Sequence, residues 1–267
     1  MNCLKSPFRY AGGKYYARKI ISEHLIESDC YCEPFAGGGS IFFYKEKSNM
    51  NILNDLDSDL MNAYSVIQNN VEEMIYIIKN IGKPTKEIHY FLKNEFKPAN
   101  NIEAGARWFY LNRTSYNGIM KPVNMCYSYV EKNCMRYNNW EKALRRASYK
   151  LEGVVLQNKD ALDCIHDLPD GCLVFVDAPY YNTKQDRFYN HVFDMKDHVK
   201  LAETIKEEND RLKFLISYDN CDDIRDMYDF MKSICNEEWR YSMNRLDYKP
   251  EHRRRYNNGD EIILKNY

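Results

Sequence analysis

The first residues that could do chemistry form a glycine-rich stretch near the start of the chain. Residues 33–39 (EPFAGGG) follow a short apolar run, and Asp55 comes directly after the next apolar run. In a doubly wound α/β sheet, glycines after the first strand let a ligand approach the backbone, and a carboxylate after the second strand can accept hydrogen bonds from ribose hydroxyls. This pairing indicates a nucleoside cofactor, although the glycines match neither the full dinucleotide fingerprint nor a P-loop. A turn without a ligand is the alternative.

A second motif, Asp177-Ala178-Pro179-Tyr180, lies at the end of the strongly apolar run 173–176. Ligands of open α/β sheets bind at the carboxyl ends of strands, and a proline there fixes the backbone where a carbonyl oxygen must be aimed. The motif is therefore placed for catalysis. The alternative is that Asp177 caps a turn and Tyr180 lies in the core.

A third motif, residues 9–14 (RYAGGK), combines a Gly-Gly pair with Lys14. The glycines allow a tight turn, and the lysine could meet a carboxylate. A surface lysine beside a turn is the alternative. Each of the three motifs is a weak indication by itself.

Alternating strand and helix patterns could bring these motifs together. The runs 31–35 and 51–54 are typical of strands, the first followed by the glycine turn and the second by a helix that Asp57 can cap and that runs to about residue 69. This order predicts a parallel sheet covered by helices. Further elements are expected as a helix over 15–27, strands at 154–156, 173–176, 214–216 and 261–264, and a helix over 196–209. The helical or irregular region 71–150 indicates an inserted domain.

Composition limits the class of protein. The chain has 267 residues, 44% hydrophobic and 29% charged, with a mean hydropathy of −0.68, and no apolar run approaches the roughly 18 residues of a membrane span. The first residues lack the apolar core of a secretion signal, so we expect a cytoplasmic protein without a membrane partner. Nine scattered cysteines without a C-x-x-C pair favour reduced thiols over a disulfide framework, and no metal site is expected.

Charge is balanced overall but uneven along the chain. The 38 basic and 39 acidic residues leave a net charge of −1. Residues 107–150 nevertheless hold nine basic and two acidic side chains, whereas residues 151–239 hold 20 acidic and 10 basic ones. The basic block could present a phosphate-attracting face. Basic side chains dispersed over a helical surface would explain this block equally well.

Four features follow one another along the chain: the motif 9–14, the stretch 33–39, Asp55 and the Asp-x-Pro-Tyr motif. They occur in the order found in the Dam-like DNA adenine methyltransferases. The chain resembles this family over nearly its whole length. The resemblance implies an α/β fold, a Rossmann-like S-adenosylmethionine-dependent methyltransferase sheet with an inserted, mainly helical target-recognition domain. Residues 1–70 and 151–267 would form the catalytic domain, and residues 71–150 the DNA-binding domain. S-adenosyl-L-methionine would be the cofactor, and the N6 amino group of adenine in double-stranded DNA the methyl acceptor.

The resemblance also implies how the cofactor is held. The residues assigned to cofactor binding are Tyr10, Lys14, Glu33, Phe35, Gly37, Gly39, Asp55 and Asp160. The first two would hold the methionine end, and the loop from Glu33 to Gly39 would wrap around the molecule. Asp55 would accept the ribose hydroxyls, and Asp160 would contact the adenine of the cofactor.

For catalysis, the resemblance implies that the residues Asp177, Ala178, Pro179 and Tyr180 grip an extruded adenine. The lone pair of the exocyclic nitrogen is delocalised into the ring, so the amine is a poor nucleophile until acceptors hold its hydrogens. Asp177 would accept one hydrogen and the carbonyl of Ala178 the other, while Tyr180 would stack on the flipped base. The family's usual motif is Asp-Pro-Pro-Tyr. Because every residue carries a carbonyl, we expect activity to be retained with Ala178.

The residues that the resemblance assigns to DNA are Asn112, Arg113, Tyr116, Asn117, Lys121 and Arg254. Tyr116 would wedge into the base stack, beside residues that contact bases and phosphates. Residues 123–129 replace the Asn-Val-Pro-Phe-Gly type segment of the best-known members, so the recognition sequence, GATC included, stays open. A cognate restriction endonuclease is a candidate partner, and a monomer or weak dimer is expected.

Two other functions stay open from the sequence alone. One is methylation of another planar amine, cytosine N4 or a protein glutamine side chain. The other is a DNA-binding homologue whose catalysis is weakened by Ala178.

Overall fold

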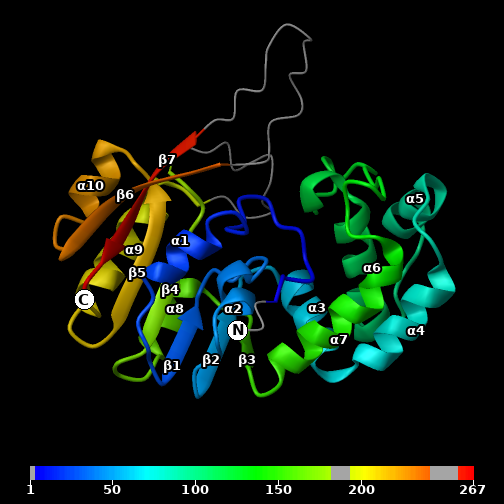
Figure 1. Ribbon diagram of the computed structural model, residues 1–267, viewed down its shortest axis with the longest axis horizontal. Coiled ribbons are helices and arrows are strands. Elements are labelled where there is room, and N and C mark those ends of the chain that lie inside the picture. The colour runs from blue at the N-terminus through cyan, green and yellow to red at the C-terminus, as the bar shows by residue number, and fades with distance from the viewer. Residues whose placement is uncertain (1–3, 182–192, 241–257) are drawn as a thin grey trace, which may run out of the picture.

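A seven-stranded sheet forms the centre of the protein in the computed structural model, which describes residues 4–181, 193–240 and 258–267 (Figure 1). Its strand order is β3-β2-β1-β4-β5-β7-β6. The strands are β1 (Cys30–Glu33), β2 (Met50–Asn54), β3 (Val155–Gln157), β4 (Leu173–Val176), β5 (Lys213–Asp219), β6 (Ser233–Arg240) and β7 (Asn258–Lys265). The first five are parallel, and β7 lies antiparallel between β5 and β6. The predicted α/β sheet is confirmed, with a Rossmann-like order.

Helices cover both faces of the sheet. They are α1 (Arg18–Glu23), α2 (Ser40–Tyr44), α3 (Ser58–Asn69), α4 (Val71–Ile81), α5 (Lys86–Asn94), α6 (Asn101–Thr114), α7 (Trp140–Leu151), α8 (Ala161–His166), α9 (Met195–Glu207) and α10 (Asp222–Met227). Alternate strand residues point to opposite faces. Leu173 and Phe175 of β4 therefore pack with α1, α2 and α3, whereas Val174 and Val176 pack with α8, α9 and α10. All four residues of β4 are buried, as expected of a central parallel strand.

The helices α4 to α7 gather to one side of the sheet (Figure 1, right). Helix α6 packs on α3 and α4, and α7 packs on α3. Trp108, Phe109 and Trp140 of this region belong to the same buried cluster as Tyr31 of β1. The helical region predicted at 71–150 thus shares its core with the sheet.

Asp57 caps α3 as the sequence predicts. Its carboxylate accepts hydrogen bonds from the backbone N–H groups of Asp59 and Leu60, at 3.0 and 3.1 Å. Such a cap satisfies donors that a helix start leaves unpaired. The helix then runs to Asn69, the predicted end.

Two sequence-based expectations were wrong. The helix expected over 15–27 is only Arg18–Glu23, because residues 14–17 form a turn that follows Gly12, whose φ is 77°, and the chain is irregular after His24. The expectation that all cysteines are free thiols is wrong for Cys30 and Cys172, which form a disulfide. These two residues are 142 positions apart in sequence, but parallel pairing of β1 with β4 places their Cα atoms 4.5 Å apart.

In the described part of the chain, the helices are too short or too polar to span a bilayer.

Glu33, the last residue of β1, is a buried carboxyl that joins this strand to α2. Its Oε1 accepts a hydrogen bond from the Tyr31 hydroxyl at 2.8 Å and another from the N–H of Phe42 at 2.7 Å. Burial raises the pKa of Glu33 to about 7, although both hydrogen bonds oppose that rise. The carboxyl therefore takes up a proton more readily in the folded protein than in the unfolded chain.

Replacing Glu33 with glutamine tests this protonation. A group with a raised folded-state pKa stabilises the fold most below its unfolded value of 4.5, and this contribution is lost as the pH rises toward 7. Glu33→Gln keeps an acceptor oxygen but does not titrate. Relative to the unmodified protein, its free energy of unfolding should rise across this window, by up to about 3 kcal/mol. Urea unfolding at a series of pH values measures the difference, and a difference independent of pH would contradict the assignment.

Candidate active site

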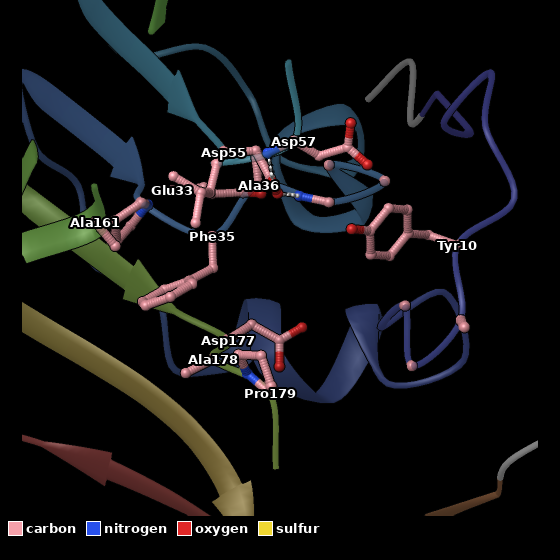
Figure 2. Close-up of a pocket in the computed structure, with 18 of the residues that line it drawn as sticks. Tyr10, Glu33, Phe35, Ala36, Asp55, Asp57, Ala161, Asp177, Ala178 and Pro179 are labelled. Atoms are coloured by element: carbon pink, nitrogen blue, oxygen red, sulfur yellow. Dashed lines mark hydrogen bonds between the residues drawn. The ribbon is translucent and has the colours of Figure 1, made fainter. Parts of the chain in front are cut away.

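A cavity of about 460 Å³ opens at the carboxyl ends of β1, β2 and β4 (Figure 2). The residues that the sequence assigned to the cofactor and to catalysis all line it, together with Lys121; they are Tyr10, Lys14, Glu33, Phe35, Gly37, Gly39, Asp55, Asp160, Asp177, Ala178, Pro179 and Tyr180. Motifs that lie far apart in the sequence thus meet in one space, because parallel strands end at the same edge of the sheet.

The glycine turn forms one wall of the cavity. Gly37 and Gly39 have φ angles of 46° and 61°, the left-handed region that favours glycine. A Cβ atom on Gly37 would lie 2.9 Å from the ring of Tyr10, which reaches toward the turn from the N-terminal segment (Figure 2). The Tyr64 hydroxyl donates to the carbonyl of Gly37 at 2.9 Å. The close approach of these groups requires glycine here.

Asp55 holds the glycine turn in place. Its Oδ2 accepts the N–H of Gly37 at 2.8 Å, and its Oδ1 accepts the N–H of Asp57 at 3.0 Å. An ionised carboxylate can accept about four hydrogen bonds. The carboxylate therefore orders the turn, and Asp55 lines the cavity beside it.

Asn54, a residue that the sequence did not single out, ties three strand ends together. Its side-chain amide donates to the carbonyls of Pro34 and Lys159, both at 3.0 Å, and its Oδ1 accepts the N–H of Lys159 at 3.1 Å. Asp160, which follows Lys159 in the chain, caps α8: its carboxylate accepts the N–H of Leu162 at 2.8 Å. This arrangement fixes the carboxylate of Asp160 at the cavity rim.

Asp177 forms an ion pair with Lys14 at the far wall of the cavity. The Lys14 ammonium lies 2.5 Å from Oδ1 of Asp177, and the Ser217 hydroxyl donates to the same oxygen at 3.0 Å. Only 4% of the Lys14 side chain is exposed, so this cation needs a paired anion. The carboxylate of Asp177 points into the cavity (Figure 2).

Tyr180 completes this wall. Its hydroxyl donates a hydrogen bond to Oε2 of Glu261 in β7, and the Lys14 ammonium lies 4.4 Å from the centre of its ring. The neighbouring Ala178 is 2% exposed. The second motif thus provides both a carboxylate and an aromatic ring to one cavity.

Several residues that line the cavity were not singled out by the sequence motifs. Phe193 packs edge-on against Phe35 with ring centres 5.7 Å apart, and Asp197 and Trp108 also border the cavity. Phe193 and Trp108 carried no motif. Glu261, which contacts the lining residue Tyr180, did carry a signal in the sequence, since it is an ionisable residue at the start of the apolar run 261–264.

The residues assigned to DNA differ in how deeply they are buried. Asn112 is buried and joins the N-terminal segment to α6, since its Oδ1 accepts the N–H of Arg9 at 2.9 Å and its Nδ2 donates to the Arg9 carbonyl at 2.7 Å. Tyr116 and Asn117 are half-buried in the short helix η1 (Tyr116–Gly118), where Asn117 has a φ of 52°. Arg254 lies outside the described residues.

Arg113 is a buried cation at the end of α6. Its side chain is 5% exposed, and its Nε has no hydrogen-bond partner among the described residues. Burial and the neighbouring Arg9 lower the pKa of Arg113 to about 10. Arg9 itself donates to the carbonyl of Ser115 at 3.3 Å, beside η1. Two guanidinium groups therefore flank this short helix.

Other basic side chains of the block 107–150 have structural partners. Arg107 donates to the carbonyls of Leu92 and Lys93, and Arg145 pairs with Glu72 and Glu141. These contacts favour dispersed basic residues over a single phosphate-attracting face.

Residues 10–243 match the family of D12 class N6 adenine-specific DNA methyltransferases. The chain is 25% identical to the type II methyltransferase M.CviBI of Paramecium bursaria Chlorella virus NC1A, over 99% of this chain and 100% of the relative. It is 26% identical to the DNA adenine methylase of Escherichia coli (strain K12), over 73% of each chain. It is also 26% identical to the type II methyltransferase M.MjaIII of Methanocaldococcus jannaschii, over 78% of this chain and 81% of the relative.

The family match spans all three motifs that meet at the cavity. The protein therefore belongs to the D12 class of N6 adenine-specific DNA methyltransferases.

Proposed function

We propose that the cavity binds S-adenosyl-L-methionine and a flipped adenine side by side, and that methyl transfer to the N6 amino group takes place between them. One observation carries this proposal: the glycine turn and the Asp177-Ala178-Pro179-Tyr180 motif line the same cavity. The cofactor supplies an activated methyl group when bound. The protein's own task is then to bind, orient and polarise the acceptor.

The residues present fit this cofactor. The cavity volume of about 460 Å³ is in the ordinary range for a small-molecule site. At Gly37 and Gly39 a Cβ atom would collide with the Tyr10 ring and the Tyr64 hydroxyl, so only glycine lets the turn pack this closely, and Asp55 holds its backbone through the N–H of Gly37. The carboxylates at the rim are suited to ribose hydroxyls, an amino group and a positively charged sulfur. We assign the cofactor to Tyr10, Glu33, Phe35, the glycine turn, Asp55 and Asp160.

Lys14 takes a different part from the one that the resemblance implies. Its ammonium contacts Asp177 and the Tyr180 ring. We therefore assign it to holding the acceptor carboxylate, rather than to the methionine end of the cofactor alone.

Asp177 and the carbonyl of Ala178 would accept the two hydrogens of the adenine amino group. Lys14 and Ser217 both bind Oδ1 of Asp177, which orients the carboxylate. Acceptors placed in advance favour a pyramidal nitrogen and stabilise the positive charge that develops on it during transfer. Replacing the usual proline by Ala178 preserves the carbonyl, and burial of Ala178 restrains the backbone there.

DNA would approach the edge of the sheet where the cavity opens. We propose residues 71–150 as the target-recognition region, with Tyr116 and Asn117 contacting bases and Lys121 at the cavity rim. The half-exposed Arg9 would meet a phosphate beside this region, with the buried Arg113 behind it. Extrusion of the adenine costs a few kcal/mol in stacking and pairing. Asn112 supports this surface by fixing the N-terminal segment against α6.

Asp177→Asn tests the acceptor role. The variant keeps the size of the side chain but places an amide where a carboxylate should accept a hydrogen, so transfer should fall by roughly 100-fold or more. Labelled-methyl transfer to mixed-sequence duplex, with the product nucleoside identified, measures the rate and separates adenine from cytosine. Asp170→Asn, at a surface carboxylate that is 84% exposed, is the matched control and should keep full activity. Equal rates in both variants would remove Asp177 from the mechanism.

Gly37→Ala tests the cofactor assignment. The alanine must adopt a positive φ, and its Cβ atom must displace the Tyr10 ring. We therefore expect affinity for S-adenosyl-L-methionine to fall by about tenfold or more. Titration calorimetry gives the dissociation constant. Gly153→Ala is the control, because Gly153 has a φ of 70° but nothing within 4 Å of the added atom and does not line the cavity. Unchanged binding by Gly37→Ala would place the cofactor elsewhere.

Arg9→Gln tests the phosphate contact. Removing one phosphate contact should weaken binding to duplex DNA and reduce the slope of log affinity against log salt by about one. Fluorescence anisotropy over a range of salt concentrations measures this slope. Arg146→Gln removes an exposed charge on α7 and should change the slope less. If Arg9→Gln altered cofactor affinity alone, the DNA assignment would be wrong.

A further inference from the structure

Glu261 is a buried carboxyl that none of the three motifs contains. It lies in β7, opposite Asp219 of β5 and Glu237 of β6 in the strand register, and 1% of it is exposed. Isoleucines and a leucine follow it at 262–264, and all three are buried. An apolar side chain would continue this pattern at less desolvation cost. An ionisable group kept at such a place needs a physical explanation.

The partner of Glu261 is the aromatic residue of the second motif. The hydroxyl of Tyr180 donates a hydrogen bond to Oε2 of Glu261. The Tyr180 ring also lies beside Tyr218, with ring centres 6.0 Å apart, and near the Lys14 ammonium. One end of the side chain is thus tied to β7 while its ring faces the cavity.

The surroundings of Glu261 are themselves charged. The pKa of Glu261 is raised to about 8, chiefly by burial and also by Asp177 and Asp219, although Lys14 and the hydrogen bond from Tyr180 oppose the rise. The hydrogen bond to Tyr180 and the ammonium of Lys14 therefore offset part of the cost of burying this carboxyl.

We infer that Glu261 is a positioning residue for methyl transfer, which holds the Tyr180 ring at the place where it receives the target base. This inference rests on the proposed stacking role of Tyr180. A tyrosine side chain turns about two bonds. A hydrogen bond at the hydroxyl restricts the first, the Cα–Cβ bond, and so fixes where the ring lies; Tyr218 and the Lys14 ammonium beside the ring restrict its rotation about the second. Ordering the ring before the base arrives removes that entropic cost from the transition state.

The test compares kcat for labelled-methyl transfer among variants of the full-length protein. Glu261→Leu removes the acceptor, and Tyr180→Phe removes the donor but keeps the ring. Each should lower kcat by about tenfold, and the double variant should be no slower than either single one, because both changes break the same bond. Glu261→Gln keeps an acceptor oxygen and should restore kcat to within about threefold of the unmodified protein.

Cofactor affinity and melting temperature of each variant serve as controls and should change little. A purely structural role for Glu261 predicts the opposite pattern, with lower melting temperature, weaker cofactor binding and an additive double variant. That pattern would overturn the inference. Should Glu261→Leu not fold, Tyr180→Phe decides alone, since full kcat in that variant shows that the hydrogen bond does not matter.

Tyr180→Ala separates failure of this inference from failure of the proposed function. It removes the ring that is to stack on the base. Loss of transfer in Tyr180→Ala with full transfer in Tyr180→Phe would reject only the role of Glu261. Full transfer in Tyr180→Ala would reject the stacking role itself.

Discussion

The ion pair between Lys14 and Asp177 holds the two halves of the cavity together. It joins the N-terminal segment to the end of β4 across a distance of 2.5 Å, with the lysine almost fully buried. Removing two charges from water costs several kcal/mol each, so the pair is favourable only with good geometry and further hydrogen bonds. Ser217 and the carbonyl of Gly12 supply those bonds. Loss of either partner would leave an uncompensated charge in the cavity wall.

Around this pair the cavity is strongly acidic. Glu33, Asp55, Asp57, Asp160 and Asp177 line it, against Lys14 and Lys121. Such a field attracts a positively charged ligand and disfavours a phosphate. The proposed sulfonium cofactor matches this field, and the proposed phosphate contact at Arg9 lies outside the cavity, beside η1.

The helical region beside the sheet is bound to the site through its core. Trp108 both packs in the shared core and borders the cavity. Asn112, four residues later on α6, holds the backbone of Arg9, next to Tyr10. Asn112 therefore connects α6 directly to the segment that carries Tyr10 and Lys14. Under the proposed function, a shift of α6 on DNA would reach the cofactor side of the cavity through this contact.

Local sequence alone determined the strand-turn-helix order, the cap at Asp57, the fully apolar β4 and the three motifs, because each depends on residues close together in the chain. It also determined, through the order of those motifs, the family resemblance. Only the tertiary structure decided which carboxylate Lys14 meets, that Arg113 is buried, that Cys30 pairs with Cys172, and that Glu261 reaches Tyr180 from 81 positions away. Those contacts depend on strand order and register, which bring distant residues together and leave no periodic trace in the sequence.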